Sequence, residues 1–239
     1  MMIIEGALSV KAALLNDKRE VFEVIIDKSK KDRNTNFIKK ITLEKDIKLS
    51  LMDRSEIEKI AIGKSHGGII AEVSNRNYQT LKSCFNENPF VAIIEGIEDP
   101  FNFGYAIRSL YSAGCSGIIV NDRDWSTSEA TILKSSAGAF DFINIYKSDD
   151  LKEVIDYAKS NGCLCLAAMR KDAVSYFDVD YKGPVLLCVG GEMRGLSKIV
   201  LDNVDKNIYI PYGNEFRNAL NASSAIAVIS YEILRQRLI

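Results

Sequence analysis

The chain has 239 residues, of which 47% are apolar and 26% charged, and its formal net charge is −1. This composition excludes a disordered or collagen-like chain and suffices for one large domain or two modest ones. The N-terminus has no basic segment before a sustained apolar run, and no stretch is long enough to cross a bilayer. We therefore expect a cytoplasmic protein with no membrane partner.

The charged and metal-binding residue types exclude further classes of function. A net charge near zero argues against a strongly basic nucleic-acid binder, although the N-terminal third carries a basic cluster. Its members are Lys28, Lys30, Lys31, Arg33, Lys39 and Lys40. Cys163 and Cys165 alternate along an expected strand, which favours buried, reduced thiols over a zinc pair. His66 is the one histidine of the sequence, so a triad or a metal site built from several histidines is excluded.

Residues 1–85 are predicted to form a small α/β domain. The apolar spacing predicts helices over 4–15, 36–43 and 55–60, a polar loop over 28–36, and strands over 21–26 and 69–73. Ser55, with Glu58 three residues later, has the pattern of a helix cap. His66 lies in a glycine-containing turn, where a structural role is expected. The polar stretch 78–88, which ends at Pro89, marks the boundary of the domain.

Residues 90–239 are predicted to form a second, larger α/β domain. Strands are expected over 90–94, 118–120, 164–168, 185–189 and 208–211, and helices over 103–113, 128–136, 150–160 and 222–238. Asn102 has the residue type of an N-cap for the first of these helices, and Gly114 that of its C-terminal stop. The alternation of strands and helices is typical of a parallel sheet covered on both faces.

Two of these strands run into loops that contain glycine. The strand over 185–189 is followed by Gly190, Gly191 and Glu192, with Gly195 shortly after. The strand over 208–211 is followed by a Pro-, Gly- and Asn-containing turn, and Asn221 then begins a helix rich in small residues. Glycine lets a backbone approach a ligand closely, and ligands bind at the carboxyl edge of α/β sheets. The pattern predicts a ligand site at this edge.

Three motifs in order resemble those of the SpoU-type (TrmH-like) RNA ribose methyltransferases of the SPOUT superfamily. They are D-P-x-N-x-G-x-x-x-R from Asp99 to Arg108, G-G-E-x-x-G-L from Gly190, and I-P at Ile210 followed by A-L-N-A-S from Ala219. The N-terminal third resembles the ribosomal-protein-like (L30e-type) domain that precedes many such enzymes. There, G-x-x-x-V-x-x-x-L begins at Gly6 and H-x-G-x-x-A begins at His66.

The resemblance implies both a fold and an activity. It implies an L30e-like RNA substrate-binding domain over 1–85 and a SPOUT methyltransferase domain over 90–239 whose parallel sheet carries a trefoil knot. It implies methyl transfer from S-adenosylmethionine to a ribose 2′-hydroxyl in ribosomal or transfer RNA, without a metal. It also implies a homodimer through the knotted domain, and the apolar helix over 222–238 agrees with such an interface.

The resemblance also implies the site residues. The catalytic positions match Arg108, Asn102, Glu192 and Asn221. The cofactor-binding positions match Gly190, Gly191, Gly195, Ile210, Pro211, Ala219 and Leu220. Arginine has a pKa above about 12 and is a poor general base, so Arg108 is better suited to stabilising the forming alkoxide and orienting the phosphate. Either role, base or electrostatic stabiliser, is open at this point.

Departures from the family pattern leave an alternative function. Ala219 stands where the family usually has serine, Met193 stands where glycine is common, and the segment between Pro211 and Ala219 is one residue longer. A non-catalytic RNA-binding protein on the same fold is the alternative, motivated by Ala219 and the modest net charge. A Rossmann dehydrogenase is disfavoured because no G-x-G-x-x-G follows a first strand.

Overall fold

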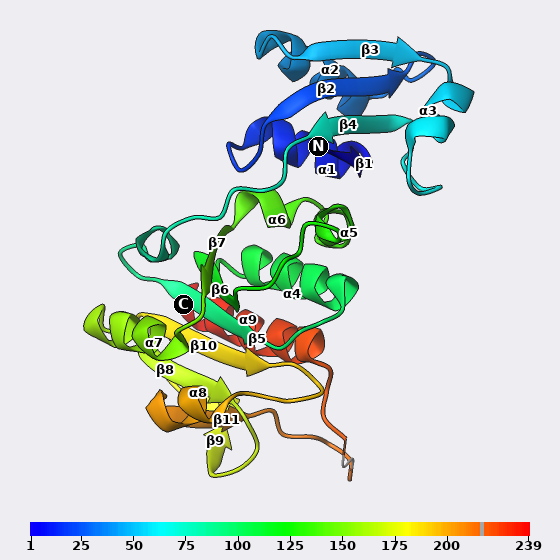
Figure 1. Ribbon diagram of the computed structural model, residues 1–239. Helices are drawn as coiled ribbons and strands as arrows, with labels where there is room; N and C mark the ends of the chain where they lie inside the picture. Colours follow the sequence, from blue (N-terminus) through cyan, green and yellow to red (C-terminus); the bar gives the residue numbers. More distant parts are fainter. Residues whose placement is uncertain (216–217) are drawn as a thin grey trace. The chain divides into compact units, whose positions relative to one another are not determined.

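The computed structural model describes residues 1–215 and 218–239, which form two compact units. One unit comprises Met1–Asn77 and Trp125–Phe142, and the other comprises Tyr78–Asp124 and Ile143–Ile239. The chain therefore passes from one unit to the other three times (Figure 1). Among the described residues, no helix is long and apolar enough to span a membrane.

The first unit contains a four-stranded mixed sheet with the strand order β1-β4-β2-β3. The strands are β1 Met2–Glu5, β2 Val21–Asp27, β3 Lys48–Met52 and β4 Ile69–Val73. Strand β4 pairs antiparallel with β1 and β2, whereas β2 and β3 are parallel. The helices before Asn77 are α1 Ala7–Leu15, α2 Arg33–Glu44 and α3 Arg54–Ile60. Buried isoleucines on β2, β4 and α3 form part of its core.

The first unit differs from the prediction mainly at its shorter elements. The predicted helix over 4–15 begins at Ala7, because Met2–Glu5 pairs with β4 as a strand. Strand β3 was not predicted. Helix α3 is capped by Asp53 and Glu56 in a capping box, so its cap lies two residues before the predicted Ser55. The predicted α2, β2 and β4 are confirmed, with α2 beginning three residues earlier than expected.

The segment Trp125–Phe142 packs in the first unit through helices α5 (Glu129–Ser135) and α6 (Ala139–Phe142). Arg19 anchors it: Nε and Nη2 donate to the two oxygens of Asp141 at 2.8 and 2.9 Å, and Nη1 donates to Glu129 at 3.1 Å. All three side chains are buried. The compact unit thus includes residues that the sequence-based division assigns to the second domain.

The second unit is built on a seven-stranded parallel sheet with the order β7-β6-β5-β10-β8-β11-β9. Its strands are β5 Phe90–Glu95, β6 Gly117–Asn121, β7 Asn144–Ser148, β8 Leu164–Ala168, β9 Ala173–Ser175, β10 Val185–Gly190 and β11 Lys206–Tyr209. Strand β10 lies between β5 and β8, although β8 precedes it in the chain. All carboxyl ends of parallel strands lie at one edge, so the loops after β5, β8, β10 and β11 meet there.

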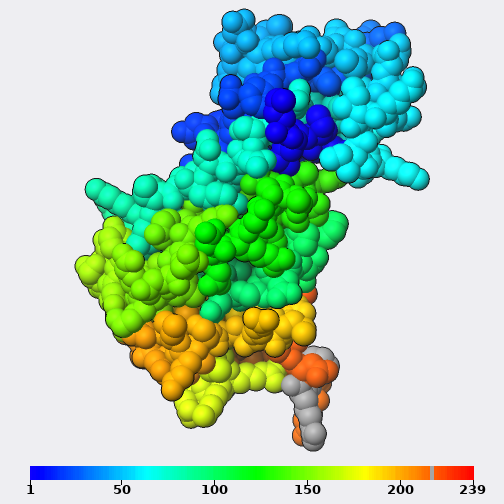
Figure 2. Space-filling model, in the orientation of Figure 1, coloured from blue at the N-terminus to red at the C-terminus, as the bar shows by residue number. Residues whose placement is uncertain are grey.

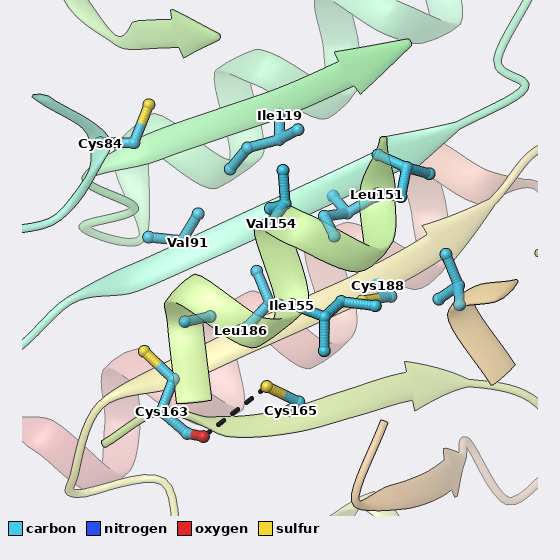
Figure 3. Close-up of a cluster of buried hydrophobic side chains, with 13 residues drawn as sticks. Cys84, Val91, Ile119, Leu151, Val154, Ile155, Cys163, Cys165, Leu186 and Cys188 are labelled. Atoms are coloured by element: carbon cyan, nitrogen blue, oxygen red, sulfur yellow. Dashed lines mark hydrogen bonds between the residues drawn. The ribbon is translucent and has the colours of Figure 1, made fainter. Parts of the chain in front are cut away.

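Helices cover the sheet of the second unit. They are α4 Pro100–Ser112, α7 Leu151–Ser160, α8 Lys198–Asn203 and α9 Ala222–Arg237, with short 3₁₀ turns at Leu81–Cys84 and Tyr176–Asp178. Helix α4 packs against α9. On α7, Val154 and Ile155 face the strand residues Val91 and Leu186 in a buried hydrophobic core (Figure 3).

Two cysteines complete this core, as the sequence predicts. Cys163 and Cys165 are buried on the same side of the sheet, and neither forms a disulfide. Burial raises the pKa of Cys163 to about 11 and that of Cys165 to about 12. Both thiols are therefore protonated at neutral pH and serve as small apolar groups.

The parallel sheet is confirmed, and the prediction of α4 needs one correction. Helix α4 begins at Pro100 and is capped by Asp99, whose carboxylate accepts from the Asn102 N–H at 2.8 Å. Asn102 therefore lies in the first turn and is not the cap. The reason is that proline is well suited to the first helical position, which shifts the start three residues earlier. The short elements β7, β9, α6 and α8 were not predicted.

Candidate functional site

The carboxyl edge of the second sheet contains a cavity of about 540 Å³. Its walls come from the loops after β8, β10 and β11 and from the first turns of α9. The lining residues are Ala168, Met169, Arg170, Val189, Gly190, Gly191, Glu192, Gly195, Ile208, Tyr209, Ile210, Tyr212, Ala219, Leu220, Asn221, Ala222, Ala225 and Ile229. Figure 2 shows these segments of the edge, yellow-green to orange, at the molecular surface. The volume is typical of a small-molecule site.

The predicted cofactor residues come together in this cavity, with one exception. Gly190, Gly191, Gly195, Ile210, Ala219 and Leu220 are all among the lining residues. Pro211 follows Ile210 but is not one of the described residues that line the cavity. Phe216 and Arg217 of the loop between β11 and α9 lie outside the described residues. The loops after β10 and β11 therefore form one site, although β8 separates the two strands.

The glycines of the loop after β10 permit close contact between backbone segments. A Cβ at Gly191 would collide with the Gly96 carbonyl oxygen and lie 3.0 Å from the Ile97 nitrogen. A Cβ at Gly190 would lie 2.5 Å from the Leu196 nitrogen. These glycines were predicted to permit close approach of a ligand, and they also permit close packing within the protein itself. At this wall of the cavity, backbone therefore packs directly on backbone.

Glu95, at the end of β5, holds this loop and was missed by the sequence analysis. Its carbonyl oxygen accepts from the Gly191 N–H at 2.6 Å, and its side chain accepts from the Ser197 N–H at 2.8 Å. The Gly195 N–H in turn donates to the Gly191 carbonyl at 2.9 Å. A carboxylate at the end of a strand was the available signal. Its partner Ser197 is 102 residues away, which the sequence does not reveal.

A smaller cavity of about 150 Å³ is lined by Glu192 and Ala222, which also line the larger one. Its other walls come from the loop after β5 and the first turn of α4. These residues are Gly96, Ile97, Glu98, Asp99, Asn102 and Met193. The exposed Glu192 thus stands at the junction between the cavity of the predicted cofactor residues and the cavity that Asn102 lines. The structure brings two predicted catalytic residues, Asn102 and Glu192, to one place.

Asn221 lies in the wall of the larger cavity and caps α9. Its Oδ1 accepts from the Ser224 N–H at 2.8 Å and from the Ser223 hydroxyl at 3.2 Å. Its interpretation as a helix cap is confirmed. The carboxamide oxygen is therefore committed to the start of the helix, which fixes the position of the side chain at the cavity.

Arg108 lies outside both cavities. It is exposed on α4, six residues after Asn102, and shares a helix face with the exposed side chains Phe101 and Tyr105. Within 1–215 and 218–239, its guanidinium has no hydrogen-bond or ion-pair partner. Arg108 is thus the one predicted catalytic residue that lines neither of these two cavities.

Other candidates from the sequence lie in the first unit. His66 is buried, and its Nδ1 accepts from the Gly68 N–H at 3.2 Å, which is the structural role that was expected. Within the basic cluster, Lys28 pairs with Asp53 at 2.8 Å and Lys30 with Asp32 at 3.1 Å. Lys31 and Arg33 are exposed at the same surface.

A test of the loop geometry uses Gly191. We expect Gly191→Ala to destabilise the fold by about 1–3 kcal/mol, because its methyl group would force the Gly96 and Gly191 backbones apart. Thermal unfolding measures this loss. Gly183→Ala is the matched control, since a Cβ at Gly183 meets no atom within 4 Å. Equal stability of the two variants would contradict the close packing of these backbones.

The comparison with protein families covers most of the chain. Residues 89–231 match the model of the SpoU rRNA Methylase family. Residues 3–79 match the model described as RNA 2′-O ribose methyltransferase substrate binding. The first match spans the sheet of the second unit and every cavity segment described above.

Individual relatives extend over nearly the whole chain. A Staphylococcus aureus protein assigned to the TrmH family of tRNA/rRNA methyltransferases is 27% identical, with 98% of this chain and 96% of that protein covered. The SpoU methyltransferase AviRb from Streptomyces viridochromogenes, solved with its cofactor AdoMet, has a TM-score of 0.79 at 20% identity, covering 99% of this chain and 90% of that one. An AdoMet-bound rRNA methyltransferase from Sinorhizobium meliloti has a TM-score of 0.79 at 21% identity, covering 98% and 86%. The chain therefore belongs to the SpoU/TrmH family of RNA 2′-O-ribose methyltransferases.

Proposed function

We propose that this chain transfers a methyl group from S-adenosylmethionine to a ribose 2′-hydroxyl of ribosomal or transfer RNA. The observation that carries the proposal is the pair of adjoining cavities that meet at Glu192 and Ala222. The larger cavity suits an adenosyl group, because apolar side chains and bare backbone line it. The smaller cavity offers room for a ribose edge beside Asn102.

In the proposed site, residues of this chain bind the cofactor, orient the sugar and stabilise developing charge. S-adenosylmethionine supplies a reactive methyl group, so no metal is required. Gly190, Gly191 and Leu220 contribute backbone groups to the cofactor cavity. The Glu192 carboxylate, which lines both cavities, would stabilise a cation of the cofactor. Asn102 and Asn221 orient the sugar, and the Arg108 guanidinium stabilises the charge that develops on the 2′-oxygen.

Calorimetry with S-adenosylmethionine tests the cofactor site. We expect saturable binding to the purified protein. We also expect loss of this binding when Ala219→Trp fills the cavity that Ala219 lines. Phe177→Trp, at a residue that is 56% exposed and outside the cavity lining, is the control. Wild-type protein that folds but binds no cofactor would favour the non-catalytic alternative and count against the proposal.

The RNA partner is proposed to bind the N-terminal domain over residues 1–85. The match of residues 3–79 to a substrate-binding model supports this assignment. The exposed Lys31 and Arg33 at the basic cluster offer contacts to phosphates. An L30e-like fold of this domain and a cytoplasmic location are part of the same proposal.

A trefoil knot in the domain over 90–239 also belongs to the proposal. The strand order supports it: β10 inserts between β5 and β8, and β11 inserts between β8 and β9. In both cases a strand pairs between two strands that precede it in the chain. A simple doubly wound sheet adds each new strand at an edge instead.

A homodimer is the proposed assembly. Exposed apolar side chains gather on the two helices that pack together, α4 and α9. They are Phe101, Tyr105 and Tyr111 on α4, and Val228 and Tyr231 on α9. A second copy is the proposed occupant of this surface, in a two-fold interface. Because Arg108 shares the face of Tyr105, this interface would present Arg108 to the site of the partner.

Sedimentation velocity at micromolar concentration tests the assembly. We expect a dimer for the wild type and a monomer for Tyr105→Glu, because a charge would be buried against the partner. Leu43→Glu is the control, since Leu43 is 66% exposed on α2 in the other unit. A wild-type protein that sediments as a monomer would contradict the dimer.

A further inference from the structure

Arg170 lies in the wall of the larger cavity, in the loop after β8. Its guanidinium stacks over the Tyr212 ring, 4.5 Å from the ring centroid, and Nη2 donates to the Asn218 carbonyl at 3.1 Å. The Tyr212 hydroxyl accepts from the Leu220 N–H at 2.7 Å. These contacts hold the guanidinium at the cavity, where an unrestrained arginine would extend into solvent.

The described lining of this cavity carries two charged side chains, Arg170 and Glu192, of opposite sign. They come from different strands: Glu192 follows β10, which borders β5, and Arg170 follows β8, which borders β11. The smaller cavity with Asn102 lies on the β5 side. The negative charge is therefore on the side of the proposed reaction, and the positive charge, after the neighbouring strand β8, lies one strand farther from it.

This polarity matches the charges of the proposed cofactor. S-adenosylmethionine carries a sulfonium and an ammonium cation, together with one α-carboxylate. The apolar side chains of the cavity, such as Ile208 and Ile210, suit the adenosyl part, which has no charge to offer Arg170. We propose that Arg170 binds the α-carboxylate of the methionyl part and so fixes the orientation of the cofactor, an inference that rests on the proposed function.

The chemistry of arginine supports this assignment. A guanidinium is a planar fork of N–H donors that fits a carboxylate with two parallel hydrogen bonds. Stacking on Tyr212 restricts the rotamers of Arg170 before the ligand binds, which lowers the entropy cost of binding. If Arg170 only stabilises the loop after β11, through its hydrogen bond to Asn218, its loss should affect ligands with and without a carboxylate equally. That difference is the basis of the test.

The experiment is calorimetric titration with S-adenosylmethionine, S-adenosylhomocysteine and 5′-methylthioadenosine, which lacks the amino-acid part. We expect Arg170→Gln to weaken the first two ligands about tenfold to a hundredfold, the range for a hydrogen bond to a charged group. Binding of 5′-methylthioadenosine should be unchanged. Arg170→Lys should recover part of the loss, because it keeps the charge but not the fork. Lys171→Gln, which removes an adjacent exposed charge outside the lining, is the control and should bind all three ligands normally.

The outcomes separate this inference from the proposed function. Equal loss of all three ligands in Arg170→Gln would show that Arg170 only supports the loop or stacks on the adenine, and would overturn the assignment. Unchanged affinity for S-adenosylmethionine would overturn it as well. If the wild type binds none of the three ligands, the proposed function fails and the inference fails with it. Thermal unfolding of each variant verifies that it is folded.

Discussion

Arg108→Ala is expected to lower the rate of methyl transfer about a hundredfold or more, with little change in cofactor affinity. The reason is that a guanidinium that stabilises charge developing on the 2′-oxygen acts in the transition state and not in the ground state. The measurement is single-turnover methylation at saturating RNA and cofactor. Arg108→Lys should restore part of the rate, because it keeps the charge without the planar fork.

Two results would contradict the catalytic role of Arg108. A near-normal single-turnover rate for Arg108→Ala would identify it as an ordinary surface residue of α4. A defect that disappears at saturating RNA would identify it as a contact to an RNA phosphate. Lys152→Ala, an exposed change on α7, is the control for loss of a surface cation.

The position of Arg108 outside both cavities leads to a second arm of this experiment. In the proposed dimer, Arg108 of one copy serves the cavity of the other. Mixed dimers of Arg108→Ala and the cavity-blocked Ala219→Trp then contain one complete site, although each variant alone contains none. Restored activity on mixing supports action across the interface. No restoration in verified mixed dimers would mean that Arg108 acts within its own chain or not at all.

Asp141→Ala is expected to reduce the free energy of unfolding by about 3 kcal/mol or more. Arg19 is fully buried and holds Asp141 through two hydrogen bonds at 2.8 and 2.9 Å, so the change removes its bidentate partner. Burial by itself lowers the pKa of Arg19, but the contacts to Asp141 and Glu129 outweigh burial and raise it. The cation therefore persists and is left poorly compensated.

Urea denaturation measures this loss. Asp156→Ala is the matched control, because Asp156 pairs with Lys152 on an exposed face and should cost at most about 1 kcal/mol. Replacing both partners, in Arg19→Met with Asp141→Leu, should not restore the wild-type stability, because the buried Glu129 carboxylate then lacks its arginine partner. Equal stabilities of Asp141→Ala and Asp156→Ala would show that the segment Trp125–Phe142 does not depend on this ion pair.

The sequence was most informative where local signals were strong. The apolar runs of β5, β8 and β10 and the capped helix α9 were predicted with bounds close to those observed. Their residue types agree with both local propensity and burial. By contrast, Met2–Glu5 resembles a continuation of α1, and only its pairing with β4, about 70 residues later, makes it a strand.

The site could be predicted only in part for a related reason. The motifs identified Gly190, Glu192 and Asn221, and the structure brings all three to one cavity. Arg170 and Glu95 belong to no motif, and each acquires its role from contacts across the fold. Asn102 was taken for the cap of α4 because asparagine suits that position. The adjacent Asp99–Pro100 pair is the stronger start signal, since it combines a capping carboxylate with a pre-set φ.

The ion pair between Arg19 and Asp141 could not be predicted from the sequence either. The two residues are 122 positions apart, and Asp141 lies in a segment that is flanked in the chain by residues of the second unit. Sequence pattern therefore assigns 125–142 to the C-terminal domain. Only the three-dimensional contacts reveal that these residues pack with the N-terminal sheet.

The most direct test of the proposed activity is transfer of a labelled methyl group from S-adenosylmethionine to RNA, followed by mapping of 2′-O-methyl ribose. The substrate is total RNA from cells that lack this protein, and the Ala219→Trp variant is the control for a blocked cofactor cavity. We expect incorporation at a defined ribose of ribosomal or transfer RNA with the wild type and none with the variant. Intact RNA binding without any methyl incorporation by the wild type would contradict the proposed methyltransferase.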